Sequence, residues 1–309
     1  MRVTVLYGGP SAEREVSLVS GTAVIEGLRS MGHDVFASDV SPTNLSGLDH
    51  PSDVIFPVLH GEFGESGELQ EILEQRKLPF VGSGSMASRI GIDKVDTKRV
   101  WEQAGLPTPA YEIVTGENKQ PARIAAPAVV KAFGSGSSID VFVCKTDDAM
   151  RTAIQTIVGK HGEALVEQYI KGPELTVGLL EEQPLAPIRI VPKNEFFDYE
   201  AKYQSKETEH RFDTGLPADV IDRCCALAKA ANDVVGARDL ARVDIMLDGS
   251  NNAYLLEINT LPGFTPVSLL PEAAKHAGIE FGPLVDRLVK RAHARGAGER
   301  VMRIPPIAR

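Results

Sequence analysis

Residues 241–259 contain the pattern that most restricts how this chain can fold, two short apolar segments that predict a β-hairpin. The segments are separated by Asp-Gly-Ser-Asn-Asn at 248–252, a run of turn-forming residues. Side chains alternate between the faces of a strand, so the register can be chosen as the pairing that separates polar from apolar residues.

The favoured register places Asp244 opposite Glu257 and Arg242 opposite Asn259 on one polar face. A shift of one residue would bury these charges and expose the aliphatic side chains. The expected apolar pairs on the other face are Val243 with Ile258, Ile245 with Leu256, and Leu247 with Tyr254.

This polar face predicts a metal site. Asp244, Glu257 and Asn259 would form an all-oxygen set of the kind that binds Mg²⁺. Two adjacent carboxylates repel each other, and a hard cation is the usual reason for placing them together. Arg242 beside them suggests that an anion also binds here, although a solvated hairpin face would explain the same residues.

The composition excludes several classes of protein. The chain has 309 residues, enough for two or three domains, and its net charge of −9 argues against a nucleic-acid-binding surface. No apolar run approaches the ~20 residues of a membrane span, so no membrane partner is expected. The N-terminus shows no signal peptide, and three cysteines make no disulfide framework. We therefore expect a cytoplasmic protein.

The order of expected elements predicts a mixed α/β protein of three modules, covering residues 1–92, 93–173 and 174–309. Strands alternate with helices in the first module, which predicts a small parallel α/β domain. Its expected strands are 2–7, 53–59 and 79–81, with helices after residue 11 and at 67–76. The other modules are expected to hold strands at 126–132, 141–145, 164–170, 174–181 and 185–191, and helices at 93–104, 147–160, 217–236 and 282–294.

Two segments could bind a nucleotide. Lys131 ends a strand before a loop of small residues at 133–138, whose backbone N–H groups could surround phosphate oxygens. Residues 167–170 end another strand, and an edge backbone there could bind adenine while Glu174 contacts a ribose. A flexible β-turn explains the first segment equally well, and a plain strand end explains the second better.

Other polar residues are ambiguous when each is taken alone. Glu13 at a helix entry fits a capping role, and His60 fits either a substrate pocket or a polar loop. Lys202 and Tyr203 lie in a very polar stretch that is either a lid or plain surface.

Taken in order, these segments resemble the D-alanine–D-alanine ligases of the ATP-grasp family, over nearly the whole chain. The match is most specific at the first segment and at the last three. The matching segments are 8–17, 60–61, 82–84, 93–94, 136–138, 172–174, 199–203, 242–244, 257–260, 262–265 and 268–269.

The resemblance implies a three-domain ATP-grasp architecture and ATP-dependent formation of D-alanyl-D-alanine through an acylphosphate, for peptidoglycan precursor synthesis. It also implies ATP and two Mg²⁺ ions as cofactors, with Mn²⁺ as a substitute, and a homodimer. The alternatives are a ligase that uses D-lactate or D-serine as second substrate, and a catalytically weak relative that binds nucleotide. Tyr203 favours D-alanine, because depsipeptide-forming relatives carry a histidine in that lid role.

The resemblance also assigns roles to individual residues. Glu13 would hold the ammonium of the first D-alanine, with Ser137 and Tyr203 hydrogen-bonding towards it, and His60 would line the same pocket. Ser268, with Lys202 near, would bind the carboxylate of the second D-alanine. The oxyanion would be stabilised by Arg242 and the backbone N–H of Gly263.

For the nucleotide, Lys94 and Lys131 would contact phosphates, together with Ser138. Asp244, Glu257 and Asn259 would hold the Mg²⁺ ions, and Asn259 would also border the nucleotide. Adenosine would contact Glu167, Gln168, Tyr169, Ile170 and Glu174.

The chain departs from the family pattern at residues 209–214, which lack the usual Pro-Ala, at Gln168, which replaces a common lysine, and at two residues near the phosphate-binding loop. Ala132 follows Lys131 where a proline is usual, and Asp140 occupies the position of an expected glycine. An anionic side chain near the phosphate-binding loop would oppose ATP binding unless it points away or pairs with a cation.

Overall fold

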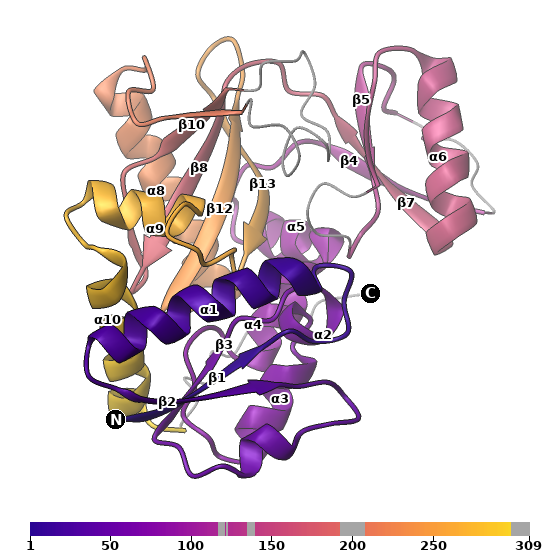
Figure 1. Cartoon of the computed structure of the whole chain (residues 1–309). Helices are drawn as coiled ribbons and strands as arrows, with labels where there is room; N and C mark the ends of the chain where they lie inside the picture. The colour runs from indigo at the N-terminus through magenta and orange to yellow at the C-terminus, as the bar shows by residue number, and fades with distance from the viewer. Residues whose placement is uncertain (117–120, 122, 135–139, 192–207, 298–309) are drawn as a thin grey trace.

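The computed structural model describes residues 1–116, 121, 123–134, 140–191 and 208–297. Three separate sheets organise the chain, one at the bottom of Figure 1 and two side by side above it. Each sheet falls within one of the three expected modules, whereas several helices pack across them.

The N-terminal sheet is parallel, as predicted. Its order is β2-β1-β3, and an isolated bridge between Ile55 and Phe80 is all that forms in the expected strand at 79–81. The strands are β1 (Arg2–Tyr7), β2 (Asp34–Asp39) and β3 (Val54–Pro57). The helical segments are α1 (Arg14–Ser30), the 3₁₀ turn η1 (Ser46–Asp49), α2 (Glu62–Glu65), α3 (Glu68–Gln75) and α4 (Ser85–Ile92).

Strand β2 was not expected from the sequence. It is an edge strand in which Val35 is buried but Phe36 is 38% exposed. A strand that buries so few side chains carries only a weak apolar pattern.

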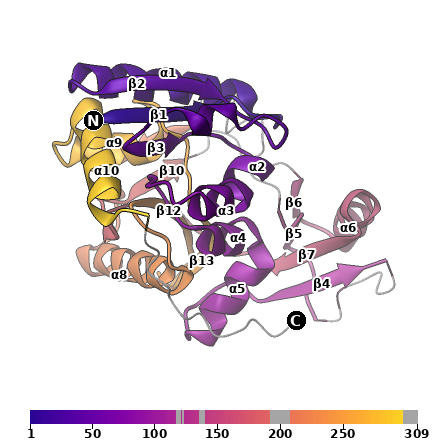
Figure 2. The ribbon, with the colours of Figure 1, turned by 90° about the horizontal axis from the view of Figure 1, so that it is seen from below.

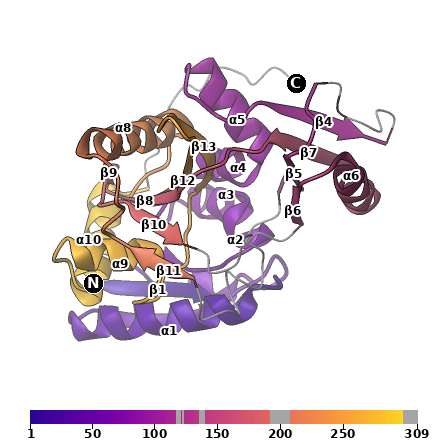
Figure 3. The same ribbon diagram turned by 90° about the horizontal axis from the view of Figure 1, so that it is seen from above.

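The second sheet is antiparallel, with the order β4-β7-β5-β6. Helix α6 lies along its outer side (Figure 3). Because β7 lies between β4 and β5, the expectation of an edge backbone at Glu167 and Gln168 is wrong. The elements are β4 (Tyr111–Thr115), β5 (Ala128–Lys131), β6 (Val141–Cys144), α6 (Asp147–His161) and β7 (Glu163–Gln168).

The third sheet has the order β11-β10-β8-β12-β13, and β9 pairs with β8. Helices α8 and α5 share its core, where Trp101 of α5 is fully buried. Its strands are β8 (Glu174–Leu180), β9 (Gln183–Pro184), β10 (Ile188–Val191), β11 (Glu209–Arg211), β12 (Leu240–Leu247) and β13 (Ala253–Asn259). The helices are α5 (Lys94–Gln103) and α8 (Ala218–Val235).

The C-terminal helices α9 (Leu269–His276) and α10 (Phe281–Arg295) return to the N-terminal sheet. Helix α10 packs against α1 and β3 (Figure 2), in a core shared by Val5, Leu28 and Leu288. Buried Asp239 adds ion pairs to two arginines of α10. These contacts join the N-terminal sheet to the third sheet.

None of the helices in the described parts of the chain combines the length and apolar character needed to cross a membrane.

Candidate active site

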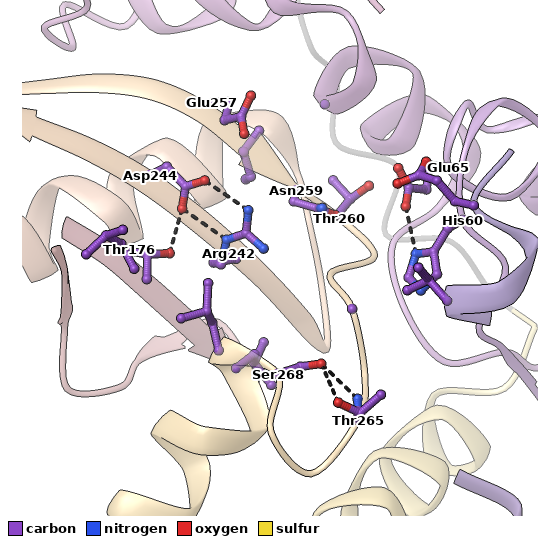
Figure 4. A pocket seen from close by; sticks show the side chains of 18 of the residues that line it. His60, Glu65, Thr176, Arg242, Asp244, Glu257, Asn259, Thr260, Thr265 and Ser268 are labelled. Atoms are coloured by element: carbon purple, nitrogen blue, oxygen red, sulfur yellow. Dashed lines mark hydrogen bonds and ion pairs between the residues drawn. The ribbon is translucent and has the colours of Figure 1, made fainter. Parts of the chain in front are cut away.

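A cavity of about 370 Å³ opens at this junction (Figure 4). The N-terminal module contributes Glu13 and His60, the hairpin contributes its polar face, and the segment before α9 contributes Ser268. Residues from distant parts of the sequence therefore meet around one space, as expected for a site that binds several small molecules.

The hairpin register at the site is the predicted one. Asp244 lies opposite Glu257, and Arg242 lies opposite Asn259. All four side chains border the cavity. The turn also forms, because Asp248 accepts hydrogen bonds from backbone N–H groups of the turn it begins.

Beyond Asp244 the register differs from the prediction. A β-bulge follows Asp244, so Ile245 pairs with Leu255, and the expected pairs of Ile245 with Leu256 and of Leu247 with Tyr254 are wrong. The extra residue on β13 lets Leu255 reach the core with 0% exposure. Bulges are common beside active sites, where they change the direction of neighbouring side chains.

Arg242 and Asp244 form a buried ion pair on this face. Arg242 Nε donates to Asp244 Oδ1 at 3.0 Å, and Nη2 donates to Oδ2 at 2.9 Å. Thr176 of β8, which pairs with Asp244 in the sheet, donates its hydroxyl to Oδ1 at 2.5 Å. These contacts fix the carboxylate in place before any ligand arrives.

The oxygen atoms on this face suit Mg²⁺ in their chemistry. Glu257 adds a second carboxylate, and its Oε2 lies 3.6 Å from the Lys94 ammonium. Among the residues that the structure describes, no three His, Cys, Asp or Glu side chains form a metal-binding group. A cation here would therefore depend on the Asn259 amide and on ligand oxygens, as is usual for Mg²⁺.

On the opposite side of the cavity, His60 and Glu65 form a buried pair with Nδ1 and Oε1 3.0 Å apart. Burial raises the pKa of the Glu65 carboxyl, and contact with His60 offsets this only in part. His60 Nε2 is buried and has no hydrogen-bond partner among the described residues. The orphaned nitrogen fits a polar ligand in this part of the cavity.

Ser268 lies at the N-cap of α9. Its hydroxyl accepts a hydrogen bond from the Thr265 N–H at 3.0 Å and lies 2.8 Å from the Thr265 hydroxyl. Gly263 also borders the cavity, and a Cβ there would come within 3.5 Å of the Ser268 hydroxyl. The end of a helix and the serine together favour a carboxylate at this position.

Lys131 and Glu167 lie in the second sheet and do not border the cavity. The Glu167 carboxylate is almost fully buried and contacts two ammonium groups, those of Lys131 and Lys98. Burial raises the pKa of Glu167, but the two lysines outweigh this and lower it to about 2. Glu167 therefore uses its side chain within the protein, and its backbone position is paired with both β4 and β5.

Four of the remaining predicted site residues lie outside the described residues: Ser137, Ser138, Lys202 and Tyr203. Glu174 borders the cavity. Gln168 ends β7 and is exposed, whereas Tyr169 and Ile170 follow it directly.

Sequence reasoning missed Thr176 and Lys98, and it did not pair His60 with Glu65. Thr176 is found only once β8 is known to lie beside β12, a pairing between segments distant in the sequence. His60 and Glu65 are close in the sequence, so this pair could have been proposed from it. Helix α2, which ends at Glu65, brings the two side chains together.

Asp140 does pair with a cation, Lys160, and it also contacts His161. It adopts a φ of +57°, a region that favours glycine, and its Oδ2 lies 2.6 Å from Lys160 Nζ and 2.8 Å from His161 Nε2. Burial raises the pKa of Asp140, but these two partners outweigh it and lower the pKa below its usual value. The charge of Asp140 is therefore balanced at the end of α6.

We expect Asp140→Gly to leave the KM for ATP within about twofold of the natural protein, because its carboxylate is already paired. Glycine relieves the left-handed backbone, while a partly exposed ion pair with Lys160 and a contact with His161 are lost, so stability should change by about 1 kcal/mol or less. Steady-state kinetics and thermal unfolding measure both. A fall of fivefold or more in the KM would show instead that Asp140 opposes ATP.

Comparisons with known proteins agree with this geometry. Residues 38–83 match the family described as "D-ala D-ala ligase N-terminus", and residues 100–290 match "D-ala D-ala ligase C-terminus". The D-alanine–D-alanine ligase of Ectopseudomonas mendocina is 42% identical over 288 residues, 92% of each chain. That of Gloeobacter violaceus is 40% identical over 94% of this chain and 99% of its own.

A solved structure supports the same conclusion. The D-alanine–D-alanine ligase from Bacillus anthracis, complexed with ATP, superposes with a TM-score of 0.83 at 29% identity. The match covers 96% of this chain and 98% of that one. The chain therefore belongs to the D-alanine–D-alanine ligase family and has the ATP-grasp fold.

Proposed function

We propose that this protein joins two D-alanines at the expense of ATP, for peptidoglycan precursor synthesis. One observation carries the proposal: the polar hairpin face with Arg242, Asp244 and Glu257 borders the same cavity as Glu13 and Ser268. A phosphoryl-transfer centre and two amino-acid positions therefore share one space. Family membership supports the same activity.

The reaction has two steps. A carboxylate oxygen of the first D-alanine attacks the γ-phosphorus of ATP, and ADP leaves. The deprotonated amine of the second D-alanine then attacks the acyl carbon, and phosphate leaves with the oxygen that it gained.

The substrate roles follow from charge. The Glu13 carboxylate suits the ammonium of the first D-alanine, and His60 borders the same cavity. Ser268 and the N-terminus of α9 suit the carboxylate of the second. Arg242 and the Gly263 N–H would stabilise the negative charge that develops on the oxyanion, usually the largest contribution to such catalysis.

Asp244, Glu257 and Asn259 would hold two Mg²⁺ ions, or Mn²⁺ in their place. When bound, these ions would neutralise the charge of the ATP phosphates. Thr176 and Arg242 hold the Asp244 carboxylate in a fixed position on this face.

Lys94 and Lys131 would contact the phosphates, and Glu174 the ribose. We assign adenine to residues 167–170 at the end of β7, where the backbone of Tyr169 and Ile170 follows the last paired residue, Gln168. Family resemblance supports further roles in substrate or nucleotide binding for Ser137, Ser138, Lys202 and Tyr203.

We further propose that the three modules are domains with boundaries near residues 92 and 173, and that the protein is a cytoplasmic homodimer. Both proposals rest on the resemblance to the family. Analytical ultracentrifugation tests the second, with a sedimenting mass of twice the chain expected.

Phosphate release with ATP, Mg²⁺ and D-alanine tests the activity, with parallel assays containing D-alanine plus D-lactate or D-serine. We expect D-alanyl-D-alanine as the main product, at a rate that rises from neutral to mildly alkaline pH, because the attacking amine must lose its proton. Tyr203→His should relax the enzyme partly towards D-lactate. Substantial D-alanyl-D-lactate from the unmodified protein would overturn the choice of second substrate.

A further inference from the structure

Helix α5 carries a buried lysine, Lys98, to which the activity above gives no role. Its side chain is 0% exposed. The ammonium lies 2.7 Å from Glu167 Oε1 and donates to the Thr108 hydroxyl at 2.5 Å and to the Pro109 carbonyl at 3.3 Å. Burying a charge is unfavourable unless the charge is paired, so the contact with Glu167 is central to this arrangement.

Glu167 is shared between two cations. Its Oε2 contacts Lys131, and its Oε1 contacts Lys98. One carboxylate between two ammonium groups leaves the cluster with a net charge of +1. If Lys98 were neutral, Glu167 would cancel the charge of Lys131 alone.

The helix connects this cluster to the cavity. Lys94 and Lys98 are four residues apart on α5 and therefore lie on the same face, one turn apart. Lys94 contacts Glu257 in the cavity, and its N–H donates to the carbonyl of Phe133, two residues beyond Lys131. The surplus charge thus lies beside the proposed phosphate position.

We propose that Lys98 is a positioning residue for ATP: it shares the charge of Glu167 and so leaves Lys131 able to attract the polyphosphate. This inference rests on the nucleotide site proposed above. A lysine that only filled the core would be replaceable by any side chain of similar shape without a specific effect on ATP.

The test compares Lys98→Gln with the natural protein. Glutamine keeps a hydrogen-bonding side chain but removes the charge. We expect the KM for ATP to rise about tenfold, a size expected for the loss of one nearby charge, with kcat and the KM for D-alanine within about threefold. Competitive binding of AMP, ADP and ATP should show a loss that grows with the number of phosphates.

Two variants serve as controls. Lys229→Gln removes a lysine that pairs with Asp233 on the surface of α8 and should leave every parameter unchanged. Lys98→Arg keeps the charge, so its KM for ATP should stay within about threefold of the natural value even if the larger side chain lowers the melting temperature. The arginine variant also provides the test if the glutamine variant does not fold.

Several outcomes would overturn the inference. One is an unchanged KM for ATP in folded Lys98→Gln, and another is a rise in Lys98→Arg as large as in the glutamine variant. A lower melting temperature and kcat at constant KM would indicate a packing role only. Failure of the natural protein to form dipeptide would contradict the proposed function instead, and nucleotide binding would still test Lys98.

Discussion

Glu257→Gln should lower kcat by about 10³-fold or more while the protein stays folded. Glutamine preserves the shape of the side chain but removes one of the two carboxylates that would hold the Mg²⁺ ions, whose charge would neutralise that of the ATP phosphates. Glu257 is 33% exposed at its side chain, so its loss should shift the melting temperature by only a few degrees. Phosphate release and thermal unfolding measure the two effects.

Glu163→Gln is the matched control, because Glu163 is exposed at the start of β7 and does not border the cavity. It should retain full activity. If Glu257→Gln kept more than a tenth of the natural kcat, the hairpin face would not be the phosphoryl-transfer centre.

Arg242→Lys should lower kcat by about 10²–10³-fold, the usual cost of losing one oxyanion-stabilising donor. Lysine keeps the positive charge but cannot reproduce the planar fork that holds Asp244 through two bonds. The KM for ATP should change much less than kcat, because the loss falls on the transition state. Steady-state kinetics with each substrate varied separates the two parameters.

Arg287→Lys is the control for this second prediction. Arg287 pairs with Glu181 near the surface, and neither residue borders the cavity. The change should therefore leave kcat and both KM values unaltered. If the kcat of Arg242→Lys stayed within threefold of the natural value, Arg242 would not be an oxyanion-stabilising residue.

The polar face of the hairpin could be predicted because alternation in strands is a local property. Asp244 and Glu257 had to share a face for the aliphatic residues to be buried. The bulge could not be predicted in this way, since Leu255 and Leu256 are both apolar and either could face the core. The structure chooses Leu255, which is 0% exposed.

Contacts between distant segments were not accessible from the sequence. Thr176 reaches Asp244 because β8 pairs with β12, and Lys98 reaches Glu167 because α5 packs between two sheets. The residues around each of these positions in the sequence give no pattern that predicts either contact. The same reason explains why Glu167 was expected on an edge strand, although β4 covers that side of β7.

The end of the chain gives a third example. The periodicity of residues 282–294 indicated a helix, and α10 forms, but its apolar stripe did not identify its partner. That partner is the N-terminal sheet with α1. A stripe specifies that a surface is buried and leaves open what buries it.

The most direct test of the ligase mechanism follows an oxygen atom. D-Alanine labelled with ¹⁸O in its carboxylate is incubated with the protein, ATP and Mg²⁺, and the phosphate and dipeptide are analysed by mass spectrometry. Attack of the carboxylate on the γ-phosphorus predicts one ¹⁸O in the released phosphate for each dipeptide formed. Unlabelled phosphate, or phosphate released without dipeptide, would contradict an acylphosphate route.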